Sequence, residues 1–542
     1  MRRLFEETYN HHFDMIIIGG GITGAFVAYE AASRGLKVAL FEKGDFGEAT
    51  SAATSKLIHG GLRYLKNFEY SLVRESLDER RTLENIAPNF VYPLAFMIPT
   101  YKNLKNNKTV LRIGMWLYDI LSYDKAWTWD QSKKLPLHKT IGAELTKALE
   151  SNVMDNKLTG SSIYYDCQNL NPDRLTLAVI KSAISKGAQV SNYAKVESLI
   201  LDNNTVTGAQ VLDIIHQKHH KFTADITINC TGPWSDIVLN SSVNNNKIHH
   251  IRRSEGIHLI TKKLCNKHAI TMMTESGRHV MLLPWRNHTI IGTTDKTYEG
   301  KPDDYHVTKD SIIGLLNEIN AIYQSEIITY SDILFAYGGM RPLVDNETEG
   351  SYNTSRKYEI CDNTKDGFDH LISVEGGKYT TSRNLAEQLI YKVEKKLHKK
   401  LKKVDTRKEY LSGSAIKDIE KFINELKLQY PEFSTESVEY IGRNYGLECH
   451  DVFALAKEDP KLAKVLTADG EILAEVAYAI KNEIPYSLSD IIFRRTGIGT
   501  LGYPGDDIFN TVVSLCREML QWDDKRTQME IQEAKKLFTL PE

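Results

Sequence analysis

The sequence has few cysteines, no long apolar run and no large excess of positive or negative charge. Its 6 cysteines are scattered over 542 residues without a C-x-x-C pair, which excludes the common zinc and disulfide patterns and favours a reducing compartment. No window approaches the roughly 18 consecutive apolar residues of a membrane span. The net charge of -2 provides no basic field for nucleic acid. We therefore expect no metal site, no nucleic-acid partner and no membrane-spanning helix.

The length predicts about three packing units, at roughly 100–200 residues per domain. Residues 76–150 are charged and helical in pattern, whereas residues 248–300 alternate apolar and polar side chains as antiparallel strands do. The pattern therefore predicts that the chain before about residue 395 forms an α/β structure, which we call the body.

Helical periodicity takes over in residues 411–542, with breaks near Pro431, Pro460, Pro485 and Pro504. Strand signals largely stop there. We therefore predict a separate, all-helical C-terminal domain.

A glycine-rich turn follows the first strand pattern. Residues 15–18 read Met-Ile-Ile-Ile, and Gly19, Gly21 and Gly24 follow in the spacing G-x-G-x-x-G before a helical pattern. Glycines in such a turn let a pyrophosphate approach the backbone, and the helix N-terminus supplies N–H donors. Glu42 ends the next strand, where a carboxylate can accept from ribose hydroxyls. The sequence therefore predicts a dinucleotide site.

Two later segments repeat the passage from a buried strand to glycine. Residues 224–236 run into Gly232, and residues 370–389 run through Gly377 and Thr380 into a helix start. Three such joints, early, middle and late in the chain, indicate one extended cofactor that all three contact. FAD fits this arrangement better than NAD.

Residues 51–65, SAATSKLIHGGLRYL, crowd hydroxyl, basic and aromatic side chains soon after the ribose acid. Arg63, beside Tyr64, is a candidate to pair with a substrate phosphate, since a planar guanidinium binds phosphate oxygens bidentately. Arg341 precedes a proline, which favours an extended backbone at a strand end. Lys378 occupies a comparable strand end. Together these cations outline an anion site beside the cofactor.

The order of SAATSKLIHGGLRYL, IGTTD, RPL and GGKYTT resembles the FAD-dependent glycerol-3-phosphate dehydrogenase family, from about residue 14 into the C-terminal domain. The resemblance implies a Rossmann-like FAD domain of glutathione-reductase type, interleaved with an antiparallel-sheet substrate domain. It also implies oxidation of sn-glycerol 3-phosphate to dihydroxyacetone phosphate, with electrons passed to membrane quinone. The expected boundaries are 14–75, 151–247 and 330–395 for the FAD-binding domain, 76–150 and 248–329 for the substrate domain, and 411–542 for the helical domain.

Carried over position by position, the resemblance implies two sets of site residues. The substrate set surrounds the catalytic pair His258 and Arg341 and comprises Arg63, Tyr64, Thr294, Asp295, Arg356 and Lys378. The cofactor set comprises Gly19, Gly21, Gly24, Glu42, Ser51, Ser55, Lys56, His59, Gly232, Gly377 and Thr380. Arg356 is matched mainly by its position.

Oxidation of an alcohol needs a base for the hydroxyl proton while a hydride leaves the neighbouring carbon. His258 is the titrating candidate by residue type. Arg341 is the alternative base, although a guanidinium pKa above about 12 makes that costly. We favour His258 as the base and Arg341 as its electrostatic partner.

Three other activities remain open. A glycerol-3-phosphate oxidase would use oxygen, an amino-acid or hydroxy-acid oxidase would use the same fold for another substrate, and a flavin-containing interaction protein would not turn over. The surplus of cations favours a dianionic phosphate over a single carboxylate. The resemblance further implies that oxidases of this family carry an insertion that this chain lacks.

A quinone acceptor implies a cytoplasmic protein held peripherally on the inner face of the cell membrane. Residues 110–123, apolar with Trp116 and Tyr118, and the cationic residues 394–403 are two candidate contacts with an anionic membrane surface. The first has a buried helix as its alternative, and the second a solvated helix end. The cationic residues 492–502 could dock on the body or on a partner. A homodimer is among the expected assemblies.

Overall fold

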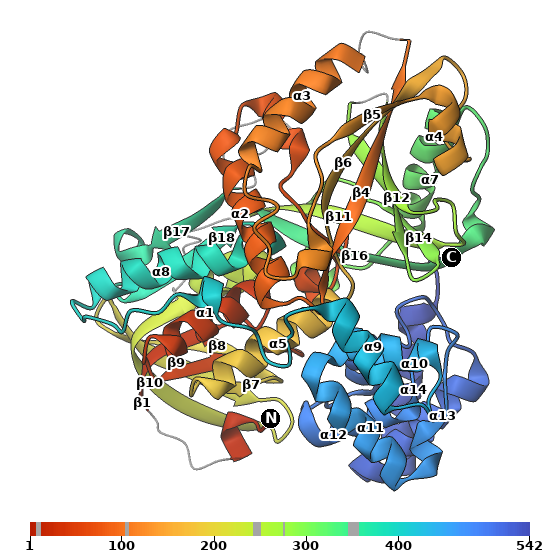
Figure 1. The fold of residues 1–542 in the computed structure, drawn as a ribbon. Coiled ribbons are helices and arrows are strands. Elements are labelled where there is room, and N and C mark those ends of the chain that lie inside the picture. Colours follow the sequence, from red (N-terminus) through yellow and green to blue (C-terminus); the bar gives the residue numbers. More distant parts are fainter. Residues whose placement is uncertain (7–11, 103–107, 242–250, 275–276, 345–356) are drawn as a thin grey trace.

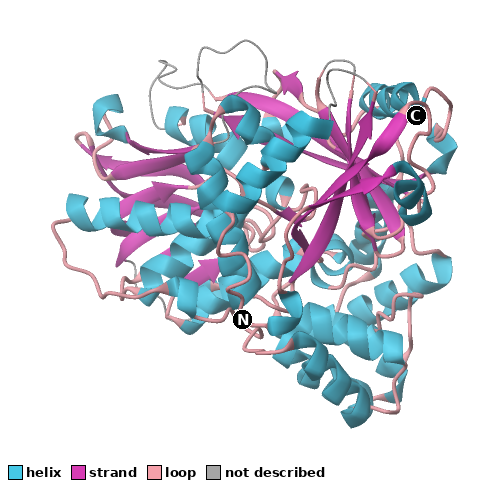
Figure 2. Ribbon diagram, turned by 45° about the horizontal axis from the view of Figure 1, so that its top comes forward, coloured by secondary structure: helices cyan, strands magenta, loops and turns pink. Residues whose placement is uncertain are grey.

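The computed structural model describes residues 1–6, 12–102, 108–241, 251–274, 277–344 and 357–542. Its strands form two separate sheets, and a group of helices follows at the C-terminal end (Figure 1; Figure 2). This arrangement confirms the expected α/β body with a helical C-terminal domain.

The first sheet has a parallel centre built from the most apolar strands. Its order is β17-β18-β10-β1-β2-β7, in which the five strands from β18 to β7 run parallel, and β9 and β8 extend it beside β10. Continuous apolar runs suit such strands, because both faces of the sheet are covered. The strands are β1 (His12–Ile18), β2 (Val38–Phe41), β7 (Gln189–Ser191), β8 (Ala194–Asp202), β9 (Thr205–Asp213), β10 (Lys218–Asn229), β17 (Tyr358–Asp362) and β18 (Leu371–Gly376).

Helix α1 (Ile22–Ser33) begins directly after the glycine turn and packs against α5 (Pro172–Ser185) and α8 (Ser382–Lys396). Apolar side chains of these helices share one buried core with β1 and β2. β18, β10 and β1 are adjacent and parallel, so the three strand-to-glycine joints that follow them open at one edge of the sheet. This placement is what contact of all three joints with one extended cofactor requires.

The second sheet is mostly antiparallel and has the order β15-β11-β14-β13-β12-β4-β6-β3, with β16 beside β11 and β5 beside β6. Helices α2 (Tyr70–Ile86), α3 (Lys108–Leu121), α4 (Ala143–Leu149) and α7 (Lys309–Tyr323) contact it. The short helix α6 (Ser235–Asn240) follows β10. The strands are β3 (Leu57–Ile58), β4 (Val91–Tyr101), β5 (Lys139–Gly142), β6 (Leu158–Asn169), β11 (Arg252–Thr261), β12 (His268–Met273), β13 (His279–Trp285), β14 (His288–Gly292), β15 (Lys296–Tyr298) and β16 (Ile333–Leu343).

Sheet membership differs from the expected boundaries at three strands. β3, β6 and β16 fall within segments expected for the FAD-binding domain, yet all three pair in the second sheet. β16 does so because it forms a long ladder with β11, and β6 because it pairs along its length with β4. The residues of a strand show its apolar pattern but not its partner, so the sequence did not show to which sheet these strands belong, and the domain boundaries stay a prediction.

β4 corrects the helical interpretation of residues 76–150. Its two prolines, Pro93 and Pro99, argue against a central strand. Both lie outside the short parallel pairing with β12, which covers Ala95–Met97. Their missing N–H groups therefore leave that ladder intact, and β4 sits inside the sheet.

The C-terminal helices have a core of their own. α9 ends at Gln429 before Pro431, α11 ends before Pro460, α12 ends before Pro485, and α13 begins after Pro504, as the sequence predicts. The helices are α9 (Ile419–Gln429), α10 (Thr435–Tyr445), α11 (Cys449–Glu458), α12 (Leu473–Asn482), α13 (Asp506–Leu520) and α14 (Asp524–Phe538).

The cationic segment 492–502 docks on the body of the same chain. Arg494 and Arg495 both donate to the carboxylate of Asp45, which lies in the loop after β2. All three side chains are buried. The structure thus decides a question that the sequence left open, since both arginines of the segment are engaged within the chain.

Candidate active site

The glycine turn brings the first two strand-to-glycine joints into contact. A Cβ added at Gly19 would lie 2.7 Å from the carbonyl oxygen of Cys230, and one at Gly24 would overlap the carbonyl oxygen of Gly19. Gly232 follows on the second joint and begins a short 3-10 turn. Any side chain at Gly19 or Gly24 would therefore push β1, α1 and the end of β10 apart.

Polar groups close the turn on both sides. Gly21 is the N-cap of α1, and Ser51 Oγ accepts a hydrogen bond of 3.0 Å from the first N–H of that helix. The two carboxylate oxygens of Glu42 accept from the N–H groups of Gly20 at 2.6 Å and Gly44 at 2.8 Å. Burial raises the pKa of Glu42 despite these bonds. The acid expected to meet a ribose therefore lies directly against the glycine turn.

The late joint reaches the segment of residues 51–65 at His59. The backbone N–H of His59 donates to the hydroxyl of Thr380 at 3.4 Å, and Thr380 is buried. Gly377 has a φ of 94° and turns the chain from β18 toward Lys378. The segment of residues 51–65 thus links the early joint, through Ser51, to the late joint, through His59.

A cationic cluster forms where these segments meet. The Nζ of Lys378 lies 4.0 Å from the ring centre of Tyr64 and donates to Ser76 Oγ at 3.0 Å. Arg63 lies over the same ring, 4.8 Å from its centre, and donates to the Tyr64 hydroxyl. Burial first, and then the charges of Lys378 and Arg63, lower the pKa of His59 to about 3. An anionic group bound here would offset that accumulation of positive charge.

His258 and Arg341 lie on one face of two paired strands. In the antiparallel ladder of β11 and β16, His258 pairs with Tyr337 and Ser254 pairs with Arg341. Directly paired residues share a face, and so do residues two apart along a strand. The sequence placed both candidates near the substrate, and this register explains how they come together.

The His258 ring has defined neighbours on that face. Its Nε2 lies 2.8 Å from Ser55 Oγ, and its ring stacks on Tyr337 with centroids 5.0 Å apart. Nδ1 is buried, with no hydrogen-bond partner among the described residues. A Cβ at Gly292 on the neighbouring β14 would overlap the imidazole. Ser55, expected at the cofactor, therefore contacts the candidate base.

The electrostatic surroundings of His258 disfavour its charged form. Burial first, and then the charges of Arg341 and Lys56, lower the pKa of His258 to about 3. Lys56 is itself buried, with its Nζ 4.7 Å from the ring centre of Trp285 and 5.5 Å from that of Tyr337. The imidazole is therefore neutral at physiological pH and able to accept a proton.

Arg341 is held by the loop that follows β14. Its guanidinium donates to the Thr293 hydroxyl at 2.7 Å and to the carbonyl oxygens of Glu255 and Thr294, both at 3.2 Å. A Cβ at Gly256 would overlap the guanidinium. These contacts fix the orientation of Arg341 on the face that carries His258.

The remaining substrate candidates differ in position. The Thr294 hydroxyl accepts from the Ile257 N–H at 2.9 Å and so ties its loop to β11. The buried carboxylate of Asp295 lies 3.9 Å from Arg341. Arg356 lies outside the described residues. Thr294 and Asp295 thus surround Arg341, and the position of Arg356 relative to them stays a prediction.

Sequence reasoning missed three residues at this site: Tyr337, Gly256 and Gly292. Each acts through a neighbour on an adjacent strand, and Gly292 belongs to the IGTTD motif without a predicted role of its own. The signal that finds Tyr337 and Gly256 is the register of β11 and β16, because both residues lie on the face of His258 and Arg341. That register was not readable from either strand alone.

Comparisons with known families match most of the chain. A family model described as FAD dependent oxidoreductase matches residues 14–382, and one described as the C-terminal domain of alpha-glycerophosphate oxidase matches residues 404–527. The chain is 32% identical, over 98% of its length and 97% of the relative's, to a glycerol-3-phosphate dehydrogenase of Synechocystis sp.. It is 30% identical to an aerobic glycerol-3-phosphate dehydrogenase of Bacillus subtilis, covering 99% of this chain and 96% of that protein.

Solved structures share the fold. The glycerol-3-phosphate dehydrogenase from Bacillus halodurans, complexed with FAD, matches with a TM-score of 0.78 and 24% identity over 99% of this chain and 96% of that one. L-alpha-glycerophosphate oxidase from Mycoplasma pneumoniae, with FAD bound, matches with a TM-score of 0.54 and 17% identity over 74% of this chain and 98% of that one. These likenesses confirm the fold class and do not separate a dehydrogenase from an oxidase.

Proposed function

The chain belongs to the FAD-dependent glycerol-3-phosphate dehydrogenase family, and on that premise we propose that it oxidises sn-glycerol 3-phosphate to dihydroxyacetone phosphate. The observation that carries this assignment is that residues 51–65 take part in two neighbouring features. Arg63 and Lys378 form a cationic cluster at Tyr64, and Ser55 contacts the neutral, buried His258. Such a site offers cations for a phosphate and an acceptor for a hydroxyl proton. A carboxylate substrate would need fewer cations.

The residues around the glycine turn fit FAD. The missing side chains at Gly19 and Gly24 let β1, α1 and the end of β10 pack closely around the turn, and the N-terminus of α1 that begins there offers N–H groups to a pyrophosphate. Each oxygen of Glu42 accepts one backbone N–H and keeps a second lone pair for a ribose hydroxyl. When bound, FAD supplies the acceptor for the hydride that leaves the alcohol carbon.

His258 serves as the base in this proposal. Nε2 lies 2.8 Å from the Ser55 hydroxyl, and Nδ1 is buried with no hydrogen-bond partner among the described residues, so the neutral ring has a nitrogen that can take the substrate proton. A pKa of about 3 keeps the ring unprotonated but makes it a weak base. An anion bound nearby favours the charged imidazolium, so binding of the dianionic substrate raises this pKa and strengthens the base.

Arg341 serves as the electrostatic partner. A guanidinium keeps its proton, with a pKa above about 12, so Arg341 stabilises the negative charge that develops on the substrate oxygen as His258 takes the proton. Its three acceptors in the protein hold it in place before the reaction. Preorganisation of this kind needs no movement during the step.

Anaerobic reduction of bound flavin tests the substrate. Glycerol 3-phosphate should bleach the flavin and free glycerol should hardly do so, because only the phosphate carries the negative charge that Arg63 and Lys378 are proposed to bind. Arg63→Ala should impair reduction by glycerol 3-phosphate while FAD content stays near that of the unmodified protein. Equal reduction rates with glycerol and its phosphate would overturn the assignment.

We propose membrane quinone as the electron acceptor, with the protein peripheral on the cytoplasmic face of the membrane. The support is that the two relatives described above, at 30% and 32% identity, are named dehydrogenases, whereas the oxidase matches at 17% identity. Among the described residues no helix is long and apolar enough to cross a bilayer. Oxygen is the second candidate acceptor, since the C-terminal family model takes its name from an oxidase.

The acceptor is tested by assaying membrane and supernatant fractions with glycerol 3-phosphate. We expect activity with short-chain quinones, little hydrogen peroxide, and most protein in the membrane fraction. Oxygen consumption that matches the quinone rate would reject the quinone and leave the substrate assignment intact.

A further inference from the structure

Helix α3 is apolar on two faces, and only one of them is covered. Met115 and Tyr118 point inward, are buried, and pack in a core shared with the second sheet. On the other face Val110, Ile113, Trp116 and Ile120 are each between 57% and 67% exposed. A helix on the surface of a protein normally turns polar residues outward, so this second apolar face needs an explanation.

The exposed side chains continue past the end of the helix. Tyr123 and Trp127 are 64% and 65% exposed, and their rings meet edge to face at 5.8 Å. We define the α3 face as Val110, Ile113, Trp116, Ile120, Tyr123 and Trp127. Helix α3 lies at the end of the molecule away from the C-terminal helices (Figure 1). Contiguous apolar surface of this kind marks an interaction site, and Trp and Tyr are typical of the membrane interface.

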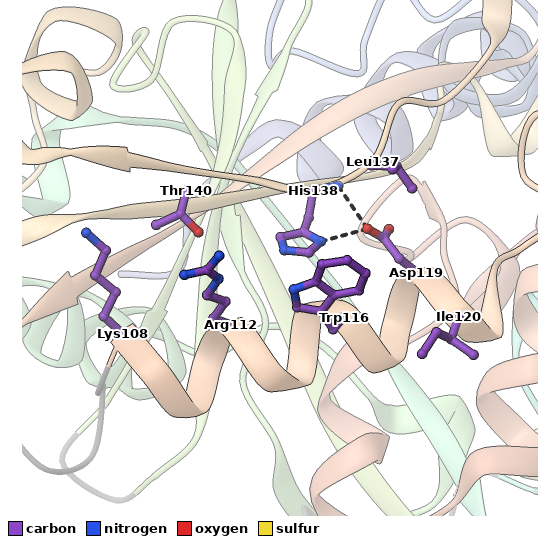
Figure 3. A pocket seen from close by; sticks show the side chains of 8 residues that line it. All are labelled: Lys108, Arg112, Trp116, Asp119, Ile120, Leu137, His138 and Thr140. Carbon is purple, nitrogen blue, oxygen red and sulfur yellow. Dashed lines mark hydrogen bonds and ion pairs between the residues drawn. The ribbon is translucent and has the colours of Figure 1, made fainter.

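A groove of about 600 Å³ runs beside this face, between α3 and the segment that leads into β5. Trp116, Ile120 and Leu137 line its apolar part, while Lys108 and Arg112 stand at one end (Figure 3). The groove therefore presents cations at one end and apolar side chains along its length, which matches a phospholipid.

Buried polar contacts build the wall of the groove. Asp119 accepts from the His138 backbone N–H at 3.1 Å and lies 2.6 Å from its Nδ1, as the dashed lines in Figure 3 mark. Lys125 donates to the other oxygen of Asp119 at 2.5 Å. The His138 ring meets the Trp116 ring edge to face at 5.7 Å. These contacts fix the two sides of the groove relative to each other, and they pair the buried carboxylate of Asp119 with Lys125 and His138.

Exposed cations flank the α3 face. Lys108 and Arg112 lie on α3, and Lys134 and Lys139 lie on either side of Leu137 in the sequence. Within the described ranges none of the four is ion-paired with a carboxylate. Their charge complements an anionic surface, and it opposes a second copy of the chain, because a two-fold contact would bring the same cations together.

Two lysines of the other cationic candidate are paired within the chain. In residues 394–403, Lys396 is paired with Asp362 and Asp369, and Lys399 is paired with Asp14. Leu401 of this segment is buried. That segment therefore offers cations without an exposed apolar face, in contrast to α3.

We propose that the α3 face docks on an anionic phospholipid bilayer, with one lipid in the groove. The lipid phosphate lies at Lys108 and Arg112, and an acyl chain runs along Trp116, Ile120 and Leu137. This inference rests on the membrane location in the proposed function but not on the proposed substrate. It places the apolar side chains in the bilayer interface and the cations at the headgroups.

Flotation of the purified holoenzyme with vesicles, without substrate, tests the inference. The vesicles are phosphatidylcholine alone or with about one third phosphatidylglycerol, because each cation favours an anionic surface. We expect binding to the anionic vesicles. The double variant Ile113→Glu/Ile120→Glu should weaken that binding at least about tenfold, since it places two charges in the interface. Arg112→Glu should weaken it about tenfold through the charge alone.

Two control variants place a glutamate at an exposed apolar or cationic residue far from α3 in the sequence. Leu428→Glu alters a leucine that is 83% exposed on α9, and Lys525→Glu alters an exposed lysine on α14. Both should bind vesicles as the unmodified protein does. FAD content, thermal unfolding and anaerobic flavin reduction should be unchanged in all variants, which separates lost docking from lost folding or lost chemistry.

Three results would overturn the inference. The unmodified protein could fail to bind anionic vesicles, the α3 variants could bind as well as the controls, or the α3 variants could dissociate a dimer in light scattering without a change in vesicle binding. The last result would assign the α3 face to a second copy of the chain. None of the three would affect the proposed substrate, which is tested by flavin reduction.

Discussion

At the scale of single residues, His258 is the most closely constrained candidate. His258→Ala should slow flavin reduction by glycerol 3-phosphate about 10²–10⁴-fold, the usual reach of general-base catalysis. FAD content should be unchanged, because the imidazole contacts Ser55 and Tyr337 rather than the glycine turn. Stopped-flow spectroscopy without oxygen gives the rate. An effect below about tenfold would move the role of base to Arg341.

The depressed pKa of His258 also predicts a pH dependence of stability. The pKa is about 3 in the folded protein and about 6.5 in the unfolded chain. Between these values the unfolded chain binds a proton that the folded protein does not. The contribution of His258 to the free energy of unfolding is therefore fully present above a pH of about 6.5. Below that pH it falls by up to about 1.4 kcal/mol for each pH unit.

His258→Asn removes that titration and supplies the comparison. Denaturant unfolding at about pH 7 and about pH 5 should show a smaller loss of stability in the variant than in the unmodified protein. His59 titrates similarly and stays in both proteins, so it cancels in the difference. The same loss in both proteins would contradict the buried, neutral state of His258.

At the scale of elements, the glycine turn joins β1, α1 and the end of β10. Gly24→Ala places a Cβ onto the carbonyl oxygen of Gly19, so the turn must open and FAD should be lost. Absorbance of the purified protein measures the flavin. The control is Gly314→Ala on α7, where a Cβ meets nothing within 4 Å, and this variant should keep its FAD. Full FAD in the Gly24 variant would refute the role of the turn.

At the scale of the whole molecule, a buried ion pair joins the C-terminal helices to the first sheet. Asp45→Ala leaves the guanidinium groups of Arg494 and Arg495 without their shared carboxylate. Arg494 keeps its bond to Asp490 and Arg495 its bond to the Glu483 carbonyl oxygen, so the free energy of unfolding should fall by about 3 kcal/mol, the lower end of the cost of breaking a buried ion pair. Circular dichroism during denaturant unfolding measures this loss.

Glu518→Ala on α13 is the matched control for that interface. Its carboxylate is exposed, so the change should alter the free energy of unfolding by less than about 0.5 kcal/mol. An equal loss in both variants would mean that the arginines of the C-terminal helices do not depend on Asp45.

Local patterns were sufficient for much of this protein. The glycine spacing, the apolar strands beside it and the proline breaks of the C-terminal helices were all predicted and are found. Each depends on residues close together in the chain, where backbone geometry and hydrophobic periodicity act. The family resemblance supplied the site residues, which local pattern alone did not.

Only the tertiary structure decided which distant segments meet. The sheet to which β6 and β16 belong, the contact of Ser55 with His258 and the docking of Arg494 and Arg495 on Asp45 all join residues far apart in the sequence. The tertiary structure likewise decided which apolar face of α3 is covered and which is exposed. A side chain's pattern shows that it is apolar or charged, whereas its burial and its pKa depend on what packs against it.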